Sequence, residues 1–253
     1  MKKINISKAI NSINSKGYFI LENFLTTKEL NNVKKAMLET LHYIHPKKIN
    51  NLQKKYYQVK SYNKKLKSNF YDIIRYDIEI LKTLHNKEIL NLVRKFFKVK
   101  TVFSANPQVT IHDDQNERLL MPHQEIANFS KDFLLMSIPI FDTNLTTGGL
   151  RVYENSHKYG YYNHISSNKI KSAFISPKIT KKFDIKDLSL KAGSAVIWHS
   201  ALIHGSYPTK QKKTVRINIV ERYNPLKYLP YLKKANQSLK LPYYNFDYNK
   251  IKE

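Results

Sequence analysis

The spacing of hydrophobic positions along the chain changes near Val102. Before that point, apolar residues recur every three or four positions, as on the buried face of an amphipathic helix. Thr26 and Glu29 have the spacing of a capping box, which marks the start of a helix. The pattern predicts helices over residues 27–44, 71–84 and 87–97, with a Lys-, Asn- and Tyr-rich loop over 46–70.

After Val102 the apolar residues form short runs rich in Val, Ile, Phe and Leu, separated by turns that contain Gly or Pro. The predicted strands cover residues 108–112, 133–140, 149–153, 194–198 and 215–220, and an earlier apolar run adds one strand within 16–25. The predicted turns lie at 147–149, 192–193, 204–206 and 207–208. Many short strands with such turns favour a sandwich or barrel of the jelly-roll kind.

The 253 residues suit a single domain, and the chain contains no internal repeat and no Gly/Ser-rich linker. We expect a helical N-terminal part over about residues 1–100, a β core over about 101–223 and a basic, aromatic tail over 224–253. No apolar run has the length of a transmembrane helix, and the first residues lack the apolar stretch of a signal peptide. The expected location is therefore the cytoplasm.

Charge and cysteine content limit the chemistry. The absence of cysteine excludes disulfides, thiolate nucleophiles, iron–sulfur clusters and cysteine-bound zinc, so any metal must be held by histidine and carboxylate side chains. The formal net charge is +25, from 44 Lys and Arg against 19 Asp and Glu, and such a field attracts anions. The basic residues are dispersed and mostly Lys, which is typical of a solvated surface. We therefore expect no specific nucleic-acid partner, and a small-molecule or carrier-bound substrate with a phosphorylated or otherwise acidic group.

Three residues form a candidate metal site. His123 and Glu125 are separated by one residue, and on a strand such positions point to the same face. His204 follows the predicted strand at 194–198. Two imidazoles and one carboxylate make up the facial triad of non-haem Fe(II) oxygenases, which leaves coordination positions open for a co-substrate and O₂.

Longer sequence motifs surround these residues. They are GYFILENFL at 17–25, TGGLRVYENSHKYG at 147–160, LKAGSAVIWH at 190–199, HGS at 204–206, then Arg216 and ERY at 221–223. In this order and spacing they resemble the phytanoyl-CoA dioxygenase family of Fe(II)/2-oxoglutarate oxygenases. The resemblance covers roughly residues 16–223.

The resemblance implies a mainly β protein with flanking α-helices around a double-stranded β-helix core of the jelly-roll or cupin kind. It also implies that His123, Glu125 and His204 bind Fe(II), and that Arg216, helped by Ser206, anchors the distal carboxylate of 2-oxoglutarate. A guanidinium group matches a carboxylate bidentately, which gives this role of Arg216 a physical basis. A further candidate contact to 2-oxoglutarate or substrate is Gln108, for which an ordinary place in a strand ladder is the alternative.

Glu125 departs from the family pattern, which has Asp at this position. The extra methylene moves the carboxylate relative to the imidazoles, and small displacements can cost activity. The site is therefore an adapted active site, a weakened or altered metal site, or a non-catalytic remnant. Halogenase chemistry is disfavoured, because it needs a residue here that cannot ligate.

A second triplet, His112-Asp113-Asp114, has the family's own His-x-Asp spacing. The interval to the Gly-Gly-Leu turn fits His123 better, and Pro122 and Gln124 match the usual surroundings of the motif. His112 and Asp114 are therefore the alternative ligands.

The main hypothesis is an Fe(II)/2-oxoglutarate-dependent dioxygenase that hydroxylates a C–H bond and converts 2-oxoglutarate and O₂ to succinate and CO₂. One alternative is a binding module with an impaired metal site, which only Glu125 supports. The other is a polyanion-binding protein, which only the net charge supports.

Overall fold

The computed structural model of the chain describes residues 3–63, 66–104, 107–114, 120–125, 132–167 and 170–225. Most of the tail expected over 224–253 lies outside these ranges. No helix in the described ranges is both long and apolar enough to cross a membrane.

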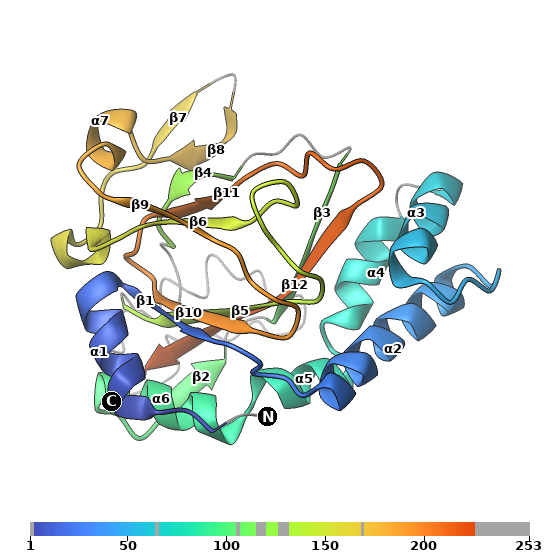
Figure 1. The fold of residues 1–253 in the computed structure, drawn as a ribbon, viewed down its shortest axis with the longest axis horizontal. Helices are drawn as coiled ribbons and strands as arrows, with labels where there is room; N and C mark the ends of the chain where they lie inside the picture. The colour runs from blue at the N-terminus through green and yellow to red at the C-terminus, as the bar shows by residue number, and fades with distance from the viewer. Residues whose placement is uncertain are drawn as a thin grey trace, which may run out of the picture.

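Two antiparallel sheets face each other across the centre of the molecule (Figure 1). In the larger sheet the order is β1 (Tyr18–Leu21), β10 (Ala195–His199), β5 (Leu134–Pro139) and β12 (Val215–Pro225), and β12 also pairs with β2 (Val102–Ser104) and β3 (Gln108–Asp113). In the smaller sheet the order is β4 (Leu120–His123), β11 (His204–Ser206), β6 (Leu150–Tyr153) and β9 (Ile185–Leu188). A hairpin of β7 (Ile165–Ser167) and β8 (Ile170–Phe174) extends beside β4. The predicted jelly-roll core is confirmed.

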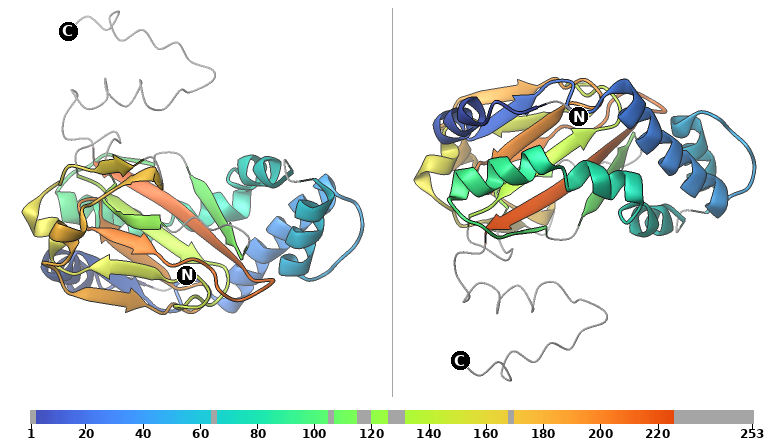
Figure 2. Two further views of the ribbon diagram at one scale, coloured as in Figure 1. Left: turned by 90° about the horizontal axis from the view of Figure 1, so that it is seen from above. Right: turned by 90° about the horizontal axis from the view of Figure 1, so that it is seen from below.

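Helices pack on the outer face of the larger sheet and at one end of it (Figure 2). They are α1 (Ile6–Lys16), α2 (Thr27–Ile44), α3 (Leu52–Tyr62), α4 (Leu66–Ile74), α5 (Ile78–Leu84) and α6 (Lys87–Phe97). Helices α5 and α6 run across the sheet, and α2, α3 and α4 gather at one end of it. A one-turn helix, α7 (Pro177–Thr180), lies on the opposite side, between β8 and β9 along the chain.

The two central strands of the larger sheet are buried on both faces. Leu134, Met136 and Ile138 of β5 belong to the apolar core shared with the helices, as do Ile217 and Ile219 of β12. The residues between them face the space between the two sheets. This alternation follows from the two-residue period of a strand, and burial on both faces explains why every residue of β5 except Ser137 is apolar.

Most predicted elements are confirmed. The helices at 27–44 and 87–97 have the predicted bounds, and Thr26 and Glu29 form the capping box with both reciprocal bonds. The strand expected within 16–25 and the five expected after Val102 are present.

Three local predictions were wrong. The expected loop at 46–70 contains α3 and the start of α4, because Asn51 caps a helix whose apolar positions are buried. The helix expected over 71–84 is interrupted, since the Asp77 side chain accepts a hydrogen bond from Glu79 N and starts a new helix, α5. The turn expected at 204–206 is strand β11, and α1 and β4 were not predicted.

Helix α3 is tied to the β core through a buried carboxylate on β3. Asp113 is fully buried and its Oδ2 accepts hydrogen bonds from the Tyr56 hydroxyl at 2.5 Å and from Lys60 Nζ at 2.9 Å. Removing one partner of a buried ion pair leaves an uncompensated charge. The resulting loss of folding free energy is larger than the loss caused by breaking an exposed pair.

We predict that Asp113→Ala lowers the free energy of unfolding by about 3 kcal/mol, because Lys60 and Tyr56 lose their buried partner. Urea denaturation would measure the change. Asp72→Ala is the matched control, since Asp72 pairs with Arg75 at 4.0 Å on the surface; its effect should stay within about 0.5 kcal/mol. Equal losses in the two variants would contradict the role given to Asp113.

A partly buried histidine at the end of β10, His199, generates a pH-dependent prediction. Burial lowers the pKa of His199 to about 4, although Asp132 opposes the shift, and His199 Nδ1 accepts a hydrogen bond from Ala201 N. The unfolded chain, with a pKa of about 6.5, binds a proton at pH values where the native state does not. Stability contributed by neutral His199 is therefore lost as the pH falls from about 6.5 towards 4.

His199→Asn keeps an acceptor near Nδ1 but cannot titrate. Between about pH 7.5 and pH 5 we expect the wild type to lose about 2 kcal/mol more stability than this variant. Denaturant titrations at the two pH values measure the difference, and parallel pH profiles would refute the prediction.

Candidate metal centre

Strand pairing brings the two predicted histidine ligands together. His123 is the last residue of β4 and His204 the first of β11, and the antiparallel register makes them direct partners. Their ring centroids are 4.4 Å apart. Glu125 lies beyond the end of β4, where its backbone N–H donates to Ser200 O at 3.1 Å. The prediction that His123 and Glu125 share a strand face was therefore wrong, although their side chains do converge.

The three side chains form a compact donor set. Glu125 Oε1 lies 3.9 Å from His123 Nε2 and 3.8 Å from His204 Nε2. The three candidate ligand atoms all lie within 4.8 Å of one another, and no other such group occurs in the described ranges. Three atoms that bind one ion through bonds of about 2.1 Å lie about 3 to 3.6 Å apart, so the three side chains would bind one ion after moving closer together.

Backbone carbonyls orient both imidazoles. His123 Nδ1 is bonded to Met121 O at 2.7 Å and His204 Nδ1 to Leu202 O at 2.9 Å. A carbonyl only accepts, so each Nδ1 carries the proton and each Nε2 presents its lone pair towards Glu125. Burial, reinforced by His123, lowers the pKa of His204 to about 3, which keeps this ring neutral as a metal ligand must be.

Arg222 of β12 holds the other oxygen of the carboxylate. Its Nε and Nη2 both donate to Glu125 Oε2, each at 3.2 Å. Burial raises the pKa of the Glu125 carboxyl, whereas the positive charge and hydrogen bonds of Arg222 lower it, and the net pKa is lowered. Glu125 is therefore ionised and able to ligate at neutral pH.

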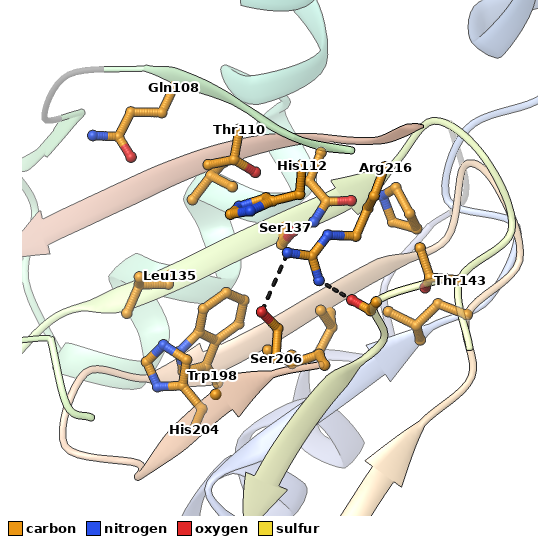
Figure 3. Close-up of a pocket in the computed structure, with 18 of the residues that line it drawn as sticks. Gln108, Thr110, His112, Leu135, Ser137, Thr143, Trp198, His204, Ser206 and Arg216 are labelled. Carbon is orange, nitrogen blue, oxygen red and sulfur yellow. Dashed lines mark hydrogen bonds between the residues drawn. The ribbon is translucent and has the colours of Figure 1, made fainter. Parts of the chain in front are cut away.

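A second charged group lies at the other end of the same cavity. Arg216 is 5% exposed; its Nη2 donates to Ser206 Oγ at 3.2 Å and its Nη1 to the Gly148 carbonyl (Figure 3). Gly148 has a φ of 86°, a conformation that favours glycine, and an added Cβ would lie 3.0 Å from Tyr207 O. Glycine at this turn therefore lets the carbonyl approach the guanidinium.

The hydrogen-bonding capacity of the Arg216 guanidinium is only partly used within the described residues. Its Nε has no hydrogen-bond partner, and no acidic side chain among the described residues pairs with it. Burial lowers its pKa to about 10, which still leaves it charged at neutral pH. A buried cation in an open cavity can bind a carboxylate bidentately, and Ser206 Oγ is adjacent to complete the contact.

The cavity between the two groups has a volume of about 110 Å³. Gln108, Thr110 and His112 reach it from β3 (Figure 3), so Gln108 lines the cavity, and its contact with 2-oxoglutarate or substrate stays a prediction. Trp198 is buried and lines the cavity, with its ring centroid 5.2 Å from that of His204.

The alternative triplet is not assembled into a metal site. His112 faces the cavity, but Asp114 accepts hydrogen bonds from the Tyr57 hydroxyl and from Lys213 N, and Asp113 binds helix α3. The two acids therefore anchor the helical layer and the loop before β12.

Arg222 and Asn218 are cavity residues to which the sequence analysis gave no role. The two-residue period of a strand could have identified both residues from the sequence, because Asn218, Val220 and Arg222 share that period with Arg216. All four residues line the cavity.

The structure resembles solved oxygenase structures at low sequence identity. The α-ketoglutarate-dependent epimerase SnoN from nogalamycin biosynthesis has a TM-score of 0.60 and 11% identity, with 87% of this chain and 83% of that chain covered. AviO1 from Streptomyces viridochromogenes Tue57 has a TM-score of 0.63 and 14% identity, with 91% of this chain and 99% of that chain covered. EctD from S. alaskensis was solved with 2-oxoglutarate and 5-hydroxyectoine. It has a TM-score of 0.63 and 15% identity, with 87% of this chain and 76% of that chain covered. At these identities the likeness shows a shared fold.

No protein with a curated description matches the sequence. The sequence does match the phytanoyl-CoA dioxygenase (PhyH) family over residues 13–216, a range that contains all three candidate ligands and Arg216. The chain therefore belongs to the phytanoyl-CoA dioxygenase family and is an Fe(II)- and 2-oxoglutarate-dependent oxygenase.

Proposed function

We propose that the protein hydroxylates a C–H bond of a small or carrier-bound substrate, with Fe(II) held by His123, Glu125 and His204 and 2-oxoglutarate held by Arg216. The observation that carries the proposal is the placement of two complementary groups on one cavity. A His₂Glu donor set lies near one end, and a buried guanidinium without an acidic partner among the described residues lies near the other. A co-substrate with a carboxylate at each end satisfies both groups.

The protein residues bind and orient, and the bound iron supplies the oxidative chemistry with 2-oxoglutarate and O₂. Arg216 and Ser206 bind the distal carboxylate, which directs the 2-oxo acid end towards the two imidazoles. Trp198 and Leu135 present apolar surface beside the metal centre and reduce access of water. Gln108 lies on the neighbouring strand and contacts 2-oxoglutarate or the substrate.

The net charge of +25 supports an acidic group on the substrate. The two guanidinium groups of the described cavity wall are engaged by 2-oxoglutarate and by Glu125 in this scheme. We therefore place the acidic group of the substrate outside the cavity, at the basic protein surface.

The test is turnover of 2-oxoglutarate. With Fe(II), 2-oxoglutarate and O₂, the protein should release succinate, and an iron chelator should abolish the release. Arg216→Met should weaken 2-oxoglutarate binding by about 100-fold or more, since the lost contact is a charged bond in a buried site. Calorimetric titration of the metal-loaded protein would measure that binding.

Arg151→Met provides the control, because Arg151 forms an ion pair with Asp187 and does not line the cavity. It should bind 2-oxoglutarate like the wild type. A metal-loaded wild type that fails to bind 2-oxoglutarate, or an Arg216→Met variant that binds it normally, would refute the assignment. Metal binding without any succinate release would instead favour the binding-module alternative.

A further inference from the structure

The contact between Arg222 and Glu125 is asymmetric. Both donors of Arg222 converge on Oε2 of Glu125, at 3.2 Å each. The other oxygen, Oε1, accepts no bond from Arg222 and lies almost equidistant from the two imidazole Nε2 atoms, at 3.9 and 3.8 Å. The two carboxylate oxygens therefore have separate surroundings: one faces a guanidinium and the other faces the imidazoles.

A second Arg–carboxylate pair in the same protein shows the ordinary geometry. Arg151 Nε and Nη2 donate to different oxygens of Asp187, at 2.8 and 3.0 Å, and so engage the whole carboxylate. That pair is about 30% exposed and lies outside the cavity. The Arg222 pair is more buried, with side-chain exposures of 15% and 20%, and leaves one oxygen available. An ion pair that engages both carboxylate oxygens is typical of a stabilising surface contact, whereas a contact to one oxygen leaves the other free to bind a ligand.

Glu125 needs such a contact more than an Asp would. Its side chain has one more rotatable bond, so its carboxylate can adopt more positions around the imidazoles. The backbone at Glu125 is fixed by its bond to Ser200 O, and Arg222 fixes the far end of the same side chain. The strand β12 in turn fixes Arg222, because Arg222 pairs with Leu135 in the centre of the larger sheet.

We propose that Arg222 is a positioning residue that makes Glu125 a metal ligand through Oε1 alone. Position 125 then works as a pair with Arg222, in place of the shorter Asp that is usual in the family. The inference rests on the proposed function, since it takes Glu125 to be a metal ligand.

The test uses Co(II) as the probe, because its affinity and its visible absorption spectrum both report on the ligands. Arg222→Gln should lower Co(II) affinity 10- to 100-fold, the usual effect of losing a residue that orients a metal ligand, and should change the spectrum. Arg222→Lys keeps the charge and should recover part of the affinity. Arg151→Gln is the matched control and should leave both readouts unchanged. Thermal unfolding of each metal-free variant checks that it folds.

Glu125→Asp adds a second, independent measurement. In the wild-type background it should lower Co(II) affinity at least tenfold, because the shorter side chain cannot reach Arg222 and the imidazoles together. In the Arg222→Gln background the same change should have a clearly smaller effect, which is the non-additivity expected of residues that act as a unit.

The two proposals fail in different ways. If the wild type binds no Co(II), the proposed metal site fails and the role of Arg222 fails with it. If the wild type binds Co(II) and 2-oxoglutarate but folded Arg222→Gln binds Co(II) with unchanged affinity and spectrum, only the positioning role is overturned. Additive effects of Glu125→Asp and Arg222→Gln would overturn it as well.

Discussion

Strand β12 is buried on both faces, and the active-site cavity depends on the register that this burial imposes. Its outward side chains, among them Ile217 and Ile219, belong to the core under the helices. Its inward side chains are Arg216, Asn218, Val220 and Arg222, which line the cavity. A shift of one residue would exchange the two sets and bury both guanidinium groups against hydrocarbon, at a cost far above that of any single contact. The apolar packing of the outer face therefore fixes the polar geometry of the inner one.

Charge inside the cavity is balanced unequally at its two ends. Near the imidazoles, Glu125 and Arg222 neutralise each other, and His204 is held neutral by burial. Near Gly148, Arg216 has two neutral acceptors but no carboxylate from the described residues. Leaving a buried cation without an anion is unfavourable, so this end of the cavity favours an anionic ligand, and the folded protein gains stability when one binds. Substrate selectivity must then come from other parts of the wall.

The fold was predictable because its determinants are local and periodic. Helix α2 begins and ends where the capping box and the heptad-like apolar spacing place it, and β5 and β12 follow from their runs of branched residues. Helix α3 was missed, because Lys55 and Tyr56 suggested a loop and their burial depends on contacts outside the helix. Lys55 Nζ donates to His45 O and Lys47 O, while Tyr56 binds Asp113 on β3. Leu52, Tyr56 and Val59 do recur at helical spacing after the cap Asn51, but the Lys and Tyr residues among them hid that signal.

The residues of the candidate site were predictable from the sequence, but the way in which their side chains converge was not. Motif order and spacing selected His123, Glu125, His204, Arg216 and Ser206, and the structure brings all five to one cavity. Spacing could not decide how His123 and Glu125 converge, because the chain leaves the strand between them. Spacing alone also left His112 and Asp114 open as ligands; the hydrogen bond from Tyr57, which is 57 residues away along the chain, shows Asp114 engaged elsewhere.

The Glu at position 125 has a different meaning once Arg222 is considered with it. Viewed alone, a longer acid in a tuned triad suggests loss of function. Viewed with a guanidinium on one oxygen, the extra methylene is the length that lets a single carboxylate reach β12 and the imidazoles at once. In the proposed site, the acid ligand and its supporting cation constrain each other: without a long acid, Arg222 would be an unpaired cation beside the metal ion. The acid at this position should therefore be interpreted jointly with Arg222, which lies six positions after Arg216, the proposed 2-oxoglutarate ligand, on the same face of β12.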